Sequence, residues 1–337
     1  MKNNISKPYI IAEIGINHDG KISIAKNLIK QAKKAGASAV KFQIFKTTSL
    51  AAPKTKVFNF FEKLKLNENQ LIELKNLSRK VKIDFICSIF DESSLNISKK
   101  LNLKKIKIAS SEVTNLELLK KISNTKKKII LSLGMADKNE IYDALKILKK
   151  NQVELLHCVS MYPCSDNEIN LNRILSLKKI YKKEVGYSDH SIGNDACKIA
   201  MLMGAKTIEK HFTYNKNLNY GDHKLSADFK GLLDLVKFSK NSQIMMGSGR
   251  IKPSNKEKKF SKLFRKGIYS SQTLAKDETI TLKKLNGSKL FCFVGILHNT
   301  SFLTTKAICK AKVLHPTTTS EFLISFNKFV ELHTSIL

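Results

Sequence analysis

The segment VGYSDHSIGNDACKIAMLMGAKTIEKH, residues 185–211, holds two short apolar runs joined by an amphipathic stretch. The runs predict strands over residues 184–187 and 206–211, and apolar side chains at helical spacing predict a helix over residues 195–203. Each strand-like run ends in a histidine beside a carboxylate, as Ser188-Asp189-His190 and Glu209-Lys210-His211. The strand–helix–strand order favours two parallel strands with a helix packed across them.

The same alternation runs through the first 245 residues or so of the chain. Six further runs are typical of strands, over residues 9–14, 39–45, 84–90, 104–109, 128–133 and 153–159. Amphipathic stretches follow most of them, over residues 23–34, 68–80, 115–122 and 138–150, and a last one, over residues 226–243, follows the eighth strand. Eight strands alternating with helices over this length predict a (β/α)8 TIM barrel in the α/β class. The glycine-rich turn of a dinucleotide-binding fold is absent, because GINHDG does not match G-x-G-x-x-G.

The texture of the sequence changes after residue 250. Residues 251–266 are polar and rich in lysine and include Pro253, which is typical of a linker. Short β-like runs follow over residues 267–337. The expected organisation is a barrel over residues 1–250, a linker over residues 251–266 and a small, mostly β domain over residues 267–337.

The formal net charge of +32 raises the question of nucleic-acid binding. Only four of the 60 basic residues are arginine, the residue best suited to phosphate and base recognition, and the lysines are spread along the chain. This pattern indicates a compositional bias that produces solvated helix faces, so we expect no nucleic-acid partner. An anionic small-molecule substrate fits the charge equally well.

Other composition features narrow the class of protein. The six cysteines include no CxxC pair, which argues against disulfides and a cysteine-based zinc site. No run of about 18 apolar residues predicts a membrane span, so no membrane association is expected. The N-terminal residues lack a signal-peptide pattern, so a cytoplasmic location is expected.

In a (β/α)8 barrel the chemistry collects where the strands end, because the loops that follow them converge there. Polar or chemically active side chains occur at every predicted strand end: Glu13, Asn17 and His18; Lys41 and Gln43; Ser88 and Phe90; Lys107, Ser110 and Glu112; Ser132; Ser160 and Tyr162; Ser188, Asp189 and His190; and Glu209, Lys210 and His211.

These strand-end residues indicate a type of chemistry. His190 and His211 on adjacent strands can share one metal ion, for which neutral imidazole suits Mn, Fe or Zn. Lysines and serines at strand ends suit phosphate or carboxylate oxygens, and Glu13 or Glu112 could act as general base or orient a water. The residues therefore predict a metal-assisted reaction on a phosphorylated, anionic small molecule, with the reaction type left open.

Eight segments resemble the N-acetylneuraminate (sialic acid) synthase family, in the order expected for it over residues 8–250. They are IAEIGINHDG (11–20), KFQIFK (41–46), KIASSE (107–112), ILSLGM (130–135), LLHCVSMYP (155–163), GYSDHSIG (186–193), IEKHFT (208–213) and GDHKLSAD (221–228). The resemblance implies a TIM barrel followed by a small antifreeze-like (SAF) domain. It also implies condensation of phosphoenolpyruvate with an N-acylated amino-sugar aldehyde, N-acetylmannosamine or a 2,4-diacetamido analogue, giving a nonulosonic acid and phosphate.

The resemblance also implies roles for individual residues. His190 and His211 match ligands of a divalent metal, Mn²⁺ first with Mg²⁺ or Co²⁺ as alternatives, and Glu13 matches a catalytic carboxylate. The residues matched to phosphoenolpyruvate are Lys41, Lys107, Ser132 and Ser188, with Gln43 beside them. The residues matched to the acyclic sugar are Glu112, Tyr162 and Asp222, and Asp189 and Glu209 are expected to orient the imidazoles. The family further implies a homodimer.

The sequence departs from the family pattern in four places. Ser88-Ile89-Phe90 replaces Thr-Pro-Phe, Ser160 replaces an asparagine near the N-acyl group, and Tyr220-Gly221-Asp222-His223 replaces Gly-Pro-Asp-His. In the tail, KKLNGSKLFCFVGIL (283–297) carries no arginine where the family has Arg-Pro-Gly, and Lys289 is the nearest substitute. These changes leave two alternatives open: a phosphoenolpyruvate-condensing synthase for a different aldehyde sugar, or a partner-dependent barrel with an incomplete sugar site.

Overall fold

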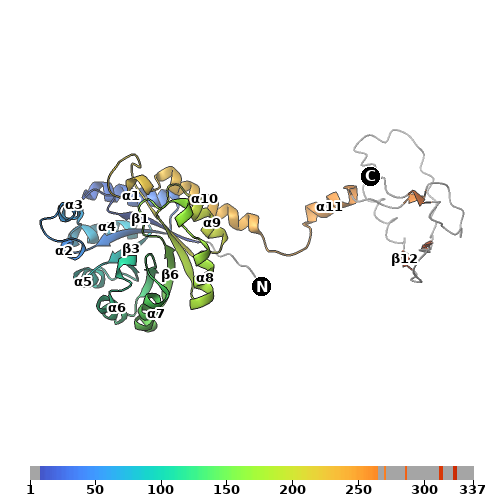
Figure 1. Cartoon of the computed structure of the whole chain (residues 1–337). Helices are drawn as coiled ribbons and strands as arrows, with labels where there is room; N and C mark the ends of the chain where they lie inside the picture. The colour runs from blue at the N-terminus through green and yellow to red at the C-terminus, as the bar shows by residue number, and fades with distance from the viewer. Residues whose placement is uncertain (1–7, 265–268, 271–284, 287–310, 314–321, 325–337) are drawn as a thin grey trace. The chain divides into compact units, whose positions relative to one another are not determined.

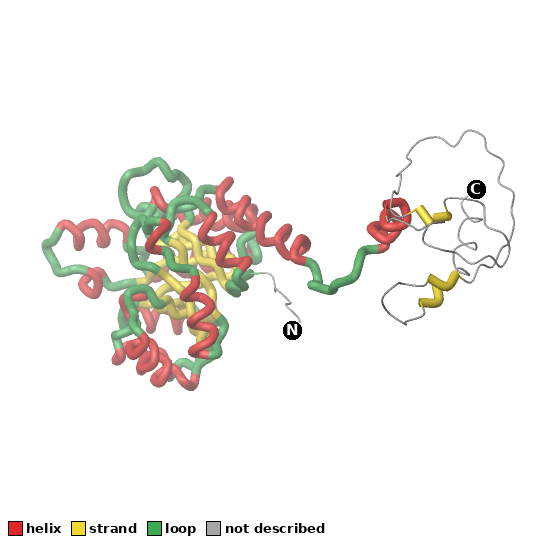
Figure 2. The backbone as a smooth tube through the Cα atoms, turned by 45° about the vertical axis from the view of Figure 1, so that its right-hand side comes forward, coloured by secondary structure: helices red, strands yellow, loops and turns green. Residues whose placement is uncertain are grey.

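The computed structural model describes residues 8–264 and four short strand segments, at residues 269–270, 285–286, 311–313 and 322–324. Its contacts divide the chain into two units, residues 1–249 and 250–337. The first unit is a closed barrel of eight parallel strands in chain order, in which β1 pairs with both β2 and β8. The strands lie together at the centre with helices around them (Figure 2).

The barrel strands are β1 (Tyr9–Gly15), β2 (Ala39–Ile44), β3 (Asp84–Ile89), β4 (Lys105–Ile108), β5 (Lys128–Ser132), β6 (Val153–Cys158), β7 (Val185–Asp189) and β8 (Thr207–His211). The helices of this unit are α1 (Ile22–Ala35), α2 (Thr47–Leu50), α3 (Lys56–Leu64), α4 (Glu68–Lys80), α5 (Glu92–Lys100), α6 (Leu116–Ser123), α7 (Lys138–Ile147), α8 (Asn172–Tyr181), α9 (Asp195–Leu202) and α10 (Phe229–Met246). Figure 1 labels most of these elements.

Local sequence fixes several of the helix ends. Asn67, Asp91 and Asp137 begin α4, α5 and α7 with capping boxes. In each box the side chain of the cap residue accepts a hydrogen bond from the backbone N–H three residues later, and the side chain of that later residue accepts one from the backbone N–H of the cap residue. Helix α1 ends at Gly36, whose φ of 92° lies in the left-handed region that glycine adopts without steric cost. The capping boxes end the loops that follow strands β2, β3 and β5, whereas Gly36 ends α1 at the opposite end of the barrel, where β2 begins.

Two hydrophobic layers support the barrel. The larger core lies between the strands and the surrounding helices. A second, small cluster comprises Ile11, Ala39, Ile86, Ile130 and Leu156, one residue from each of five strands. Because side chains alternate along a strand, residues two positions later on these strands share the same face. Apolar side chains thus fill the barrel interior below a polar layer nearer the carboxyl ends of the strands, which includes Glu13, Lys41 and Ser88.

The predicted strands agree with the observed ones to within two residues at each end. The barrel prediction is therefore confirmed, whereas the short helices α2, α3, α5 and α8 were not predicted. Within the described residues no helix is long and apolar enough to cross a membrane.

The second unit contains a helix where a linker was expected, α11 (Asn255–Phe264). Two hydrogen bonds start this helix despite its polar, lysine-rich sequence. Ser254 Oγ accepts from the backbone N–H of Glu257, and the Glu257 carboxylate accepts from the backbone N–H of Ser254. The strands described here form two antiparallel pairs, β9 (Tyr269–Ser270) with β10 (Leu285–Asn286) and β11 (Ala311–Val313) with β12 (Phe322–Ile324). The predicted SAF domain, with Lys289, otherwise lies outside the described residues.

Candidate active site

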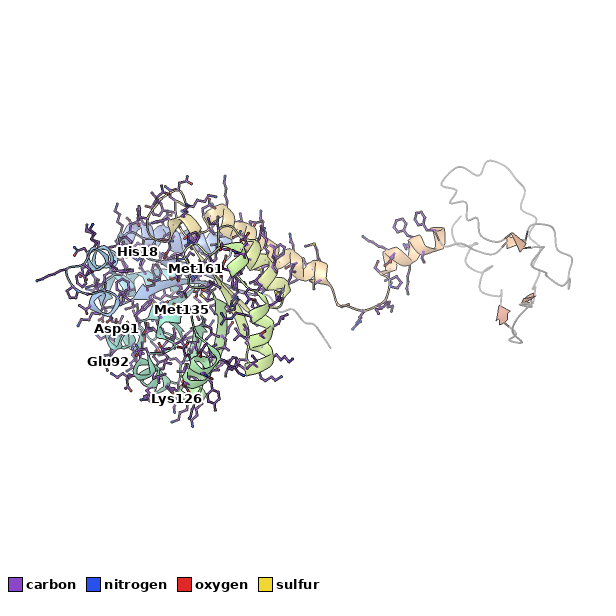
Figure 3. All side chains as sticks on the ribbon, in the orientation of Figure 1. His18, Asp91, Glu92, Lys126, Met135 and Met161 are labelled. Carbon is purple, nitrogen blue, oxygen red and sulfur yellow. The ribbon has the colours of Figure 1, made fainter. Side chains whose placement is uncertain are left out.

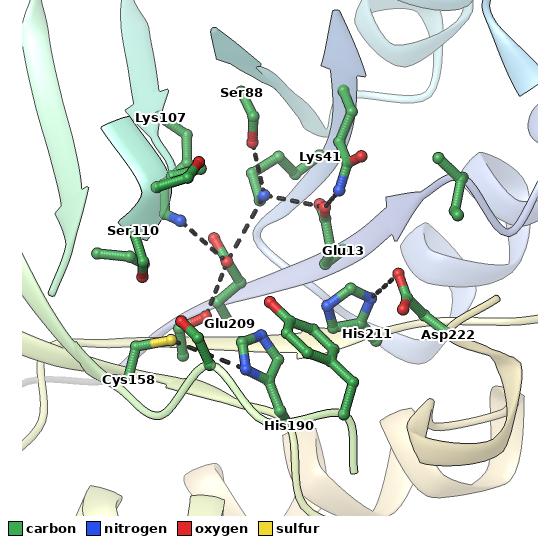
Figure 4. Close-up of a pocket in the computed structure, with 18 of the residues that line it drawn as sticks. Glu13, Lys41, Ser88, Lys107, Ser110, Cys158, His190, Glu209, His211 and Asp222 are labelled. Carbon is green, nitrogen blue, oxygen red and sulfur yellow. Dashed lines mark hydrogen bonds and ion pairs between the residues drawn. The ribbon is translucent and has the colours of Figure 1, made fainter. Parts of the chain in front are cut away.

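A pocket of about 500 Å³ opens at the carboxyl ends of the barrel strands. The residues to which the sequence assigned catalytic, metal-binding or substrate-binding roles all line it except Glu112. Of the other strand-end candidates, Asn17, His18, Asp189 and Lys210 do not line it. Figure 4 shows their side chains converging from separate strands on one space. The loops after β5 and β6 carry the exposed side chains of Met135 and Met161 (Figure 3).

Lys41 on β2 is the centre of one charged group at the pocket floor. Its ammonium nitrogen lies 2.8 Å from Ser88 Oγ and 3.0 Å from Glu13 Oε1, and all three side chains are buried. Gln43 Nε2 donates to the same Glu13 oxygen at 3.2 Å. The other oxygen, Glu13 Oε2, is buried with no hydrogen-bond partner among the described residues. The site therefore keeps one carboxylate oxygen available to a substrate or a water.

Glu209 on β8 is the centre of the second charged group. Its Oε1 accepts from Ser188 Oγ at 2.9 Å and lies 3.3 Å from Lys107 Nζ and 3.6 Å from Lys41 Nζ. Two lysines thus share one buried carboxylate (Figure 4). The second oxygen of Glu209 and the hydroxyl of Ser132 are also buried without a partner in the part of the chain that is described. Buried polar atoms without a hydrogen bond are rare in native proteins, so these atoms indicate where a polar ligand would bind.

The two glutamates differ in ionisation. Burial raises the pKa of Glu13 to about 7, although the neighbouring Lys41 opposes the rise. Burial acts on Glu209 in the same direction, but Lys107 and Lys41 more than offset it and hold the pKa of Glu209 below its usual range. Two carboxyls whose environments separate their pKa values are suited to different roles, one exchanging protons and one holding a fixed charge.

His190 and His211 lie side by side, with ring centroids 5.4 Å apart. His190 Nδ1 is 2.7 Å from the carbonyl oxygen of Val159, so this nitrogen carries a proton and Nε2 is the nitrogen left for a metal when the ring is neutral. Burial lowers the pKa of His190, but the contacts with Cys158 and the Val159 carbonyl oxygen outweigh burial and raise the pKa above its ordinary value. Burial holds the pKa of His211 well below its ordinary value, so the ring is neutral. Its Nδ1 lies 3.5 Å from Asp222 Oδ2 without forming a hydrogen bond. Tyr162 packs over the His190 ring with centroids 4.1 Å apart.

This pair of imidazoles fits an open divalent site. The contact with Val159 places a proton on His190 Nδ1 and leaves Nε2 for a metal, and His211 Nδ1 is a buried nitrogen without a hydrogen bond among the described residues. In the described part of the chain, no group of three or more His, Cys, Asp or Glu side chains is arranged around a common metal position. The two histidines would therefore be the ligands supplied by the protein, with water or substrate in the remaining positions.

Strand alternation separates the residues of the two histidine motifs. Ser188 and Glu209 point into the barrel and bond to each other, whereas Asp189 and Lys210 face the helix layer. Within the described residues, neither Asp189 nor Glu209 forms a hydrogen bond or an ion pair with an imidazole. The prediction that these two carboxylates orient the histidines is wrong. Asp189 lies on the opposite face of its strand from His190 and pairs with Lys210. Glu209 shares a face with His211, but it bonds to Ser188 and pairs with Lys41 and Lys107 instead.

Asp189 and Lys210 form a buried ion pair behind the site. Their charged atoms are 2.7 Å apart, and Lys210 also donates to the carbonyl oxygen of Ser191 at 2.6 Å. Asp189 Oδ1 accepts from Tyr187 and from both the backbone and hydroxyl of Ser191. Burial would raise the pKa of Asp189, but Lys210 outweighs it and the pKa lies below its ordinary value. The network fixes the turn that carries His190.

Lys210→Met should lower the free energy of unfolding by about 3–5 kcal/mol, because it leaves the Asp189 charge buried without its partner. Urea unfolding followed by far-ultraviolet circular dichroism measures this, since the chain has no tryptophan. The matched control is Lys198→Met, which removes a partly exposed pair with Asp234 and should cost less than about 1 kcal/mol. Equal effects of the two variants would contradict the assigned role of Lys210.

The loop after β8 is held against the loop after β1. His223 Nε2 lies 3.1 Å from Asp19 Oδ1, and His223 Nδ1 is 2.6 Å from the hydroxyl of Thr213. Tyr214 and Tyr220 both donate to Asp19 Oδ2. This cluster fixes the loop that presents Asp222 to the pocket.

Glu112 lies outside the pocket lining. Asn115 donates to its Oε2 at 2.7 Å and Ser111 to its Oε1 at 3.0 Å, so both oxygens are held within its own loop. Several lining residues escaped the sequence reading, among them Cys158, whose sulfur lies 3.8 Å from His190 Nδ1, and the side chains of Phe60 and Phe61. Cys158 was recoverable, because it follows inward-facing Leu156 by two positions. No sequence signal marks Phe60 or Phe61.

Comparison with known proteins agrees with this geometry. The NeuB family model matches residues 28–251. The N,N'-diacetyllegionaminic acid synthase of Campylobacter jejuni is 40% identical, over 81% of this chain and 88% of its own length. The pseudaminic acid synthase of Helicobacter pylori is 31% identical, over 82% and 86%.

A solved structure gives the same result for the fold. The crystal structure of the N-acetylneuraminic acid (sialic acid) synthetase of Leptospira borgpetersenii, in complex with citrate, has a TM-score of 0.72 and 33% identity. The match covers 78% of this chain and 94% of that one. Family model, sequence relatives and barrel structure therefore agree, and this chain belongs to the NeuB family of nonulosonic acid synthases.

Proposed function

We propose that this protein condenses phosphoenolpyruvate with an N-acylated amino-sugar aldehyde and water, giving a nonulosonic acid and inorganic phosphate. The observation that supports this most is the pocket floor around Lys41 and Lys107. Three buried oxygens there have no hydrogen-bond partner in the described part of the chain: Glu13 Oε2, Glu209 Oε2 and Ser132 Oγ. Buried lysines with hydroxyl groups suit the phosphate and carboxylate of one small anion. The relatives named above are synthases of acids of this class.

The proposed reaction balances without an oxidant or reductant. Carbon 3 of phosphoenolpyruvate forms a bond to the aldehyde carbon, and the aldehyde oxygen takes up a proton. Water adds at carbon 2, and the bond between carbon 2 and the phosphate oxygen breaks to release phosphate. Glu13, whose raised pKa suits proton exchange near neutral pH, accepts the proton of the water.

The other residues hold and orient the substrates. Lys41, Lys107 and the hydroxyl groups of Ser132 and Ser188 bind the phosphoenolpyruvate oxygens. Glu209 keeps both lysines charged and placed, since it bonds to each of them.

The sugar and the metal complete the proposed site. Asp222 and Tyr162 contact the sugar beside the histidines. His190 and His211 would hold a divalent ion, for which Mn²⁺ is the preferred candidate. The bound ion would polarise the aldehyde oxygen as a Lewis acid. We also propose that the chain forms a homodimer, as the family resemblance implies.

The test is phosphate release from phosphoenolpyruvate with a panel of aldehydes: N-acetylmannosamine, its 2,4-diacetamido analogue, and phosphorylated pentose and tetrose sugars. We expect release with an N-acylated hexosamine and Mn²⁺, and none when either the aldehyde or the metal is omitted. Turnover with the phosphorylated sugars alone would replace this function by another condensation. Release without any aldehyde would indicate a phosphatase instead.

A further inference from the structure

A second pocket opens at the opposite end of the barrel from the candidate active site, where the strands begin. Its volume is about 280 Å³, close to the lower limit of about 300 Å³ for small-molecule sites, so it suits a small ligand. Its lining includes Ile130, Lys105, Lys128, Glu154 and Glu184. It shares no lining residue with the candidate active site. We call it the amino-end pocket.

Glu154 on β6 points into the barrel from this end. Leu156, two positions later on the same strand, belongs to the small apolar cluster inside the barrel, and side chains two positions apart share a face. Lys128 on β5 follows the same rule, because it precedes Ile130 of that cluster by two positions. The amino-end pocket therefore extends inward from the strand starts to Ile130, and the apolar cluster separates it from the charged floor of the candidate active site.

One oxygen of Glu154 is buried without a hydrogen bond. This atom, Oε1, has no partner among the described residues. Burial raises the pKa of the carboxyl, and the charge of Glu184 adds to the rise. Thr207, Lys105 and Lys128 oppose the rise without cancelling it. The surrounding side chains thus leave the carboxylate short of donors and of positive charge, and a bound cation with N–H groups would supply both.

Lys105 and Lys128 differ in the partners they already have. Lys105 Nζ lies 3.4 Å from Asp84 Oδ2 and 3.8 Å from the centroid of the Tyr9 ring, so its charge has two partners. Lys128 and Glu184 are exposed at the rim, and in the described part of the chain neither side chain forms a hydrogen bond or an ion pair. Lys128 is therefore available to an anionic group of a ligand.

The charges around the amino-end pocket favour a ligand that carries both signs. A simple anion would be repelled by Glu154 and Glu184, and a simple cation by Lys105 and Lys128. A metal ion would lack ligands, because no group of three or more His, Cys, Asp or Glu side chains in the described residues is arranged around a common position. An ammonium group on Glu154 and a carboxylate on Lys128 would each form a charge-assisted hydrogen bond. Ile130 offers an apolar surface at the inner end.

We propose that the amino-end pocket binds a small α-amino acid, with its ammonium group on Glu154, its carboxylate on Lys128 and a short apolar side chain against Ile130. Neither phosphoenolpyruvate nor an N-acylated sugar carries an ammonium group, so the ligand of this pocket is distinct from the substrates of the proposed condensation. The site makes use of residues that the proposed function leaves without a role.

The test measures binding to the full-length chain by isothermal titration calorimetry, with L-alanine, L-valine and L-leucine as probes. We expect saturable binding at one site per chain. N-acetyl-L-leucine removes the positive charge and 3-methylbutylamine removes the carboxylate, and each should bind at least about tenfold more weakly than L-leucine, the loss expected for one charge-assisted hydrogen bond. No saturable binding of any of the three amino acids, or equal binding of L-leucine and its N-acetyl derivative, would overturn the proposal.

Glu154→Gln should weaken the binding of L-leucine at least about tenfold, because it keeps the shape of the side chain and removes its charge. Glu117→Gln is the matched control, since Glu117 is exposed on α6 and pairs only with Lys120 in the described part of the chain, and it should keep the wild-type affinity. If Glu154→Gln fails to fold, Lys128→Gln tests the carboxylate contact from the exposed rim. Wild-type affinity in the folded variant would overturn the assignment.

Competition distinguishes the amino-end pocket from the candidate active site. The titration with L-leucine is repeated in the presence of excess phosphoenolpyruvate and Mn²⁺, and saturable binding should persist. Complete displacement of L-leucine by phosphoenolpyruvate would place the probe at the charged floor of the candidate active site and overturn the proposal. Phosphate release is assayed without any amino acid, so failure of the proposed condensation and failure of this site are separate results.

Discussion

His190→Ala and His211→Ala should each lower kcat/KM for the condensation by more than about a thousandfold. Lewis-acid stabilisation by a bound metal contributes several kcal/mol to a barrel reaction of this type, and each 1.4 kcal/mol or so is a factor of ten. The two rings lie 5.4 Å apart, and the described residues offer no third histidine, cysteine or carboxylate arranged with them around a metal. Loss of either ring therefore leaves no adequate site.

The measurement includes metal binding as well as rate. Mn²⁺ binding, followed by electron paramagnetic resonance, should be lost in both variants together with activity. His157→Gln is the control, because His157 lies outside the pocket lining and its Nε2 bonds to the Ile169 carbonyl oxygen, a contact that glutamine can replace. Full activity and full Mn²⁺ binding in the His190→Ala, His211→Ala double variant would refute the metal assignment.

Glu13→Gln should lower kcat/KM by about 10²–10⁴, the usual effect of removing a general base. The substitution keeps the shape of the side chain and its contact with Lys41 while preventing proton transfer. Because the base acts as a carboxylate and burial raises its pKa, wild-type kcat/KM should fall as the pH drops toward and below 7. The glutamine variant should lose that acidic limb.

Glu112→Gln is the matched control for this prediction. Both oxygens of Glu112 are bonded within its own loop, away from the pocket lining, so its loss should change kcat/KM by less than about tenfold. The sequence alone left the general base open between the two glutamates. An inactive Glu112→Gln with an active Glu13→Gln would assign the base to Glu112 instead.

The barrel was predictable because each strand and helix carries its own local signal. Strands such as β2 (AVKFQI) are short segments in which apolar residues predominate, and helices such as α4 and α7 begin with capping boxes visible in the sequence. Residues at the carboxyl ends of the strands were then expected to lie together, because the loops that follow the strands converge in any barrel of this kind. The charged residues of the pocket floor lie there.

The parts that sequence reasoning missed depend on direction and distance. The segments Ser188-Asp189-His190 and Glu209-Lys210-His211 have similar sequences. The alternation of side chains along each strand turns Ser188 and Glu209 into the barrel, whereas Asp189 pairs with Lys210 on the outer face. No sequence pattern marked Phe60 or Phe61, and the helix α3 that carries them was not predicted. The segment of residues 45–66 brings both rings into the pocket lining and places Phe60 beside Gly221.

The most direct test of the proposed condensation uses phosphoenolpyruvate labelled with oxygen-18 in the atom that bridges carbon 2 and phosphorus. The labelled substrate is incubated with the N-acylated sugar aldehyde and Mn²⁺, and the products are analysed by mass spectrometry. Attack of water at carbon 2, with cleavage of the carbon–oxygen bond, predicts that the label leaves in the inorganic phosphate. Label retained in the sugar acid, or phosphate released without consumption of the aldehyde, would contradict the account.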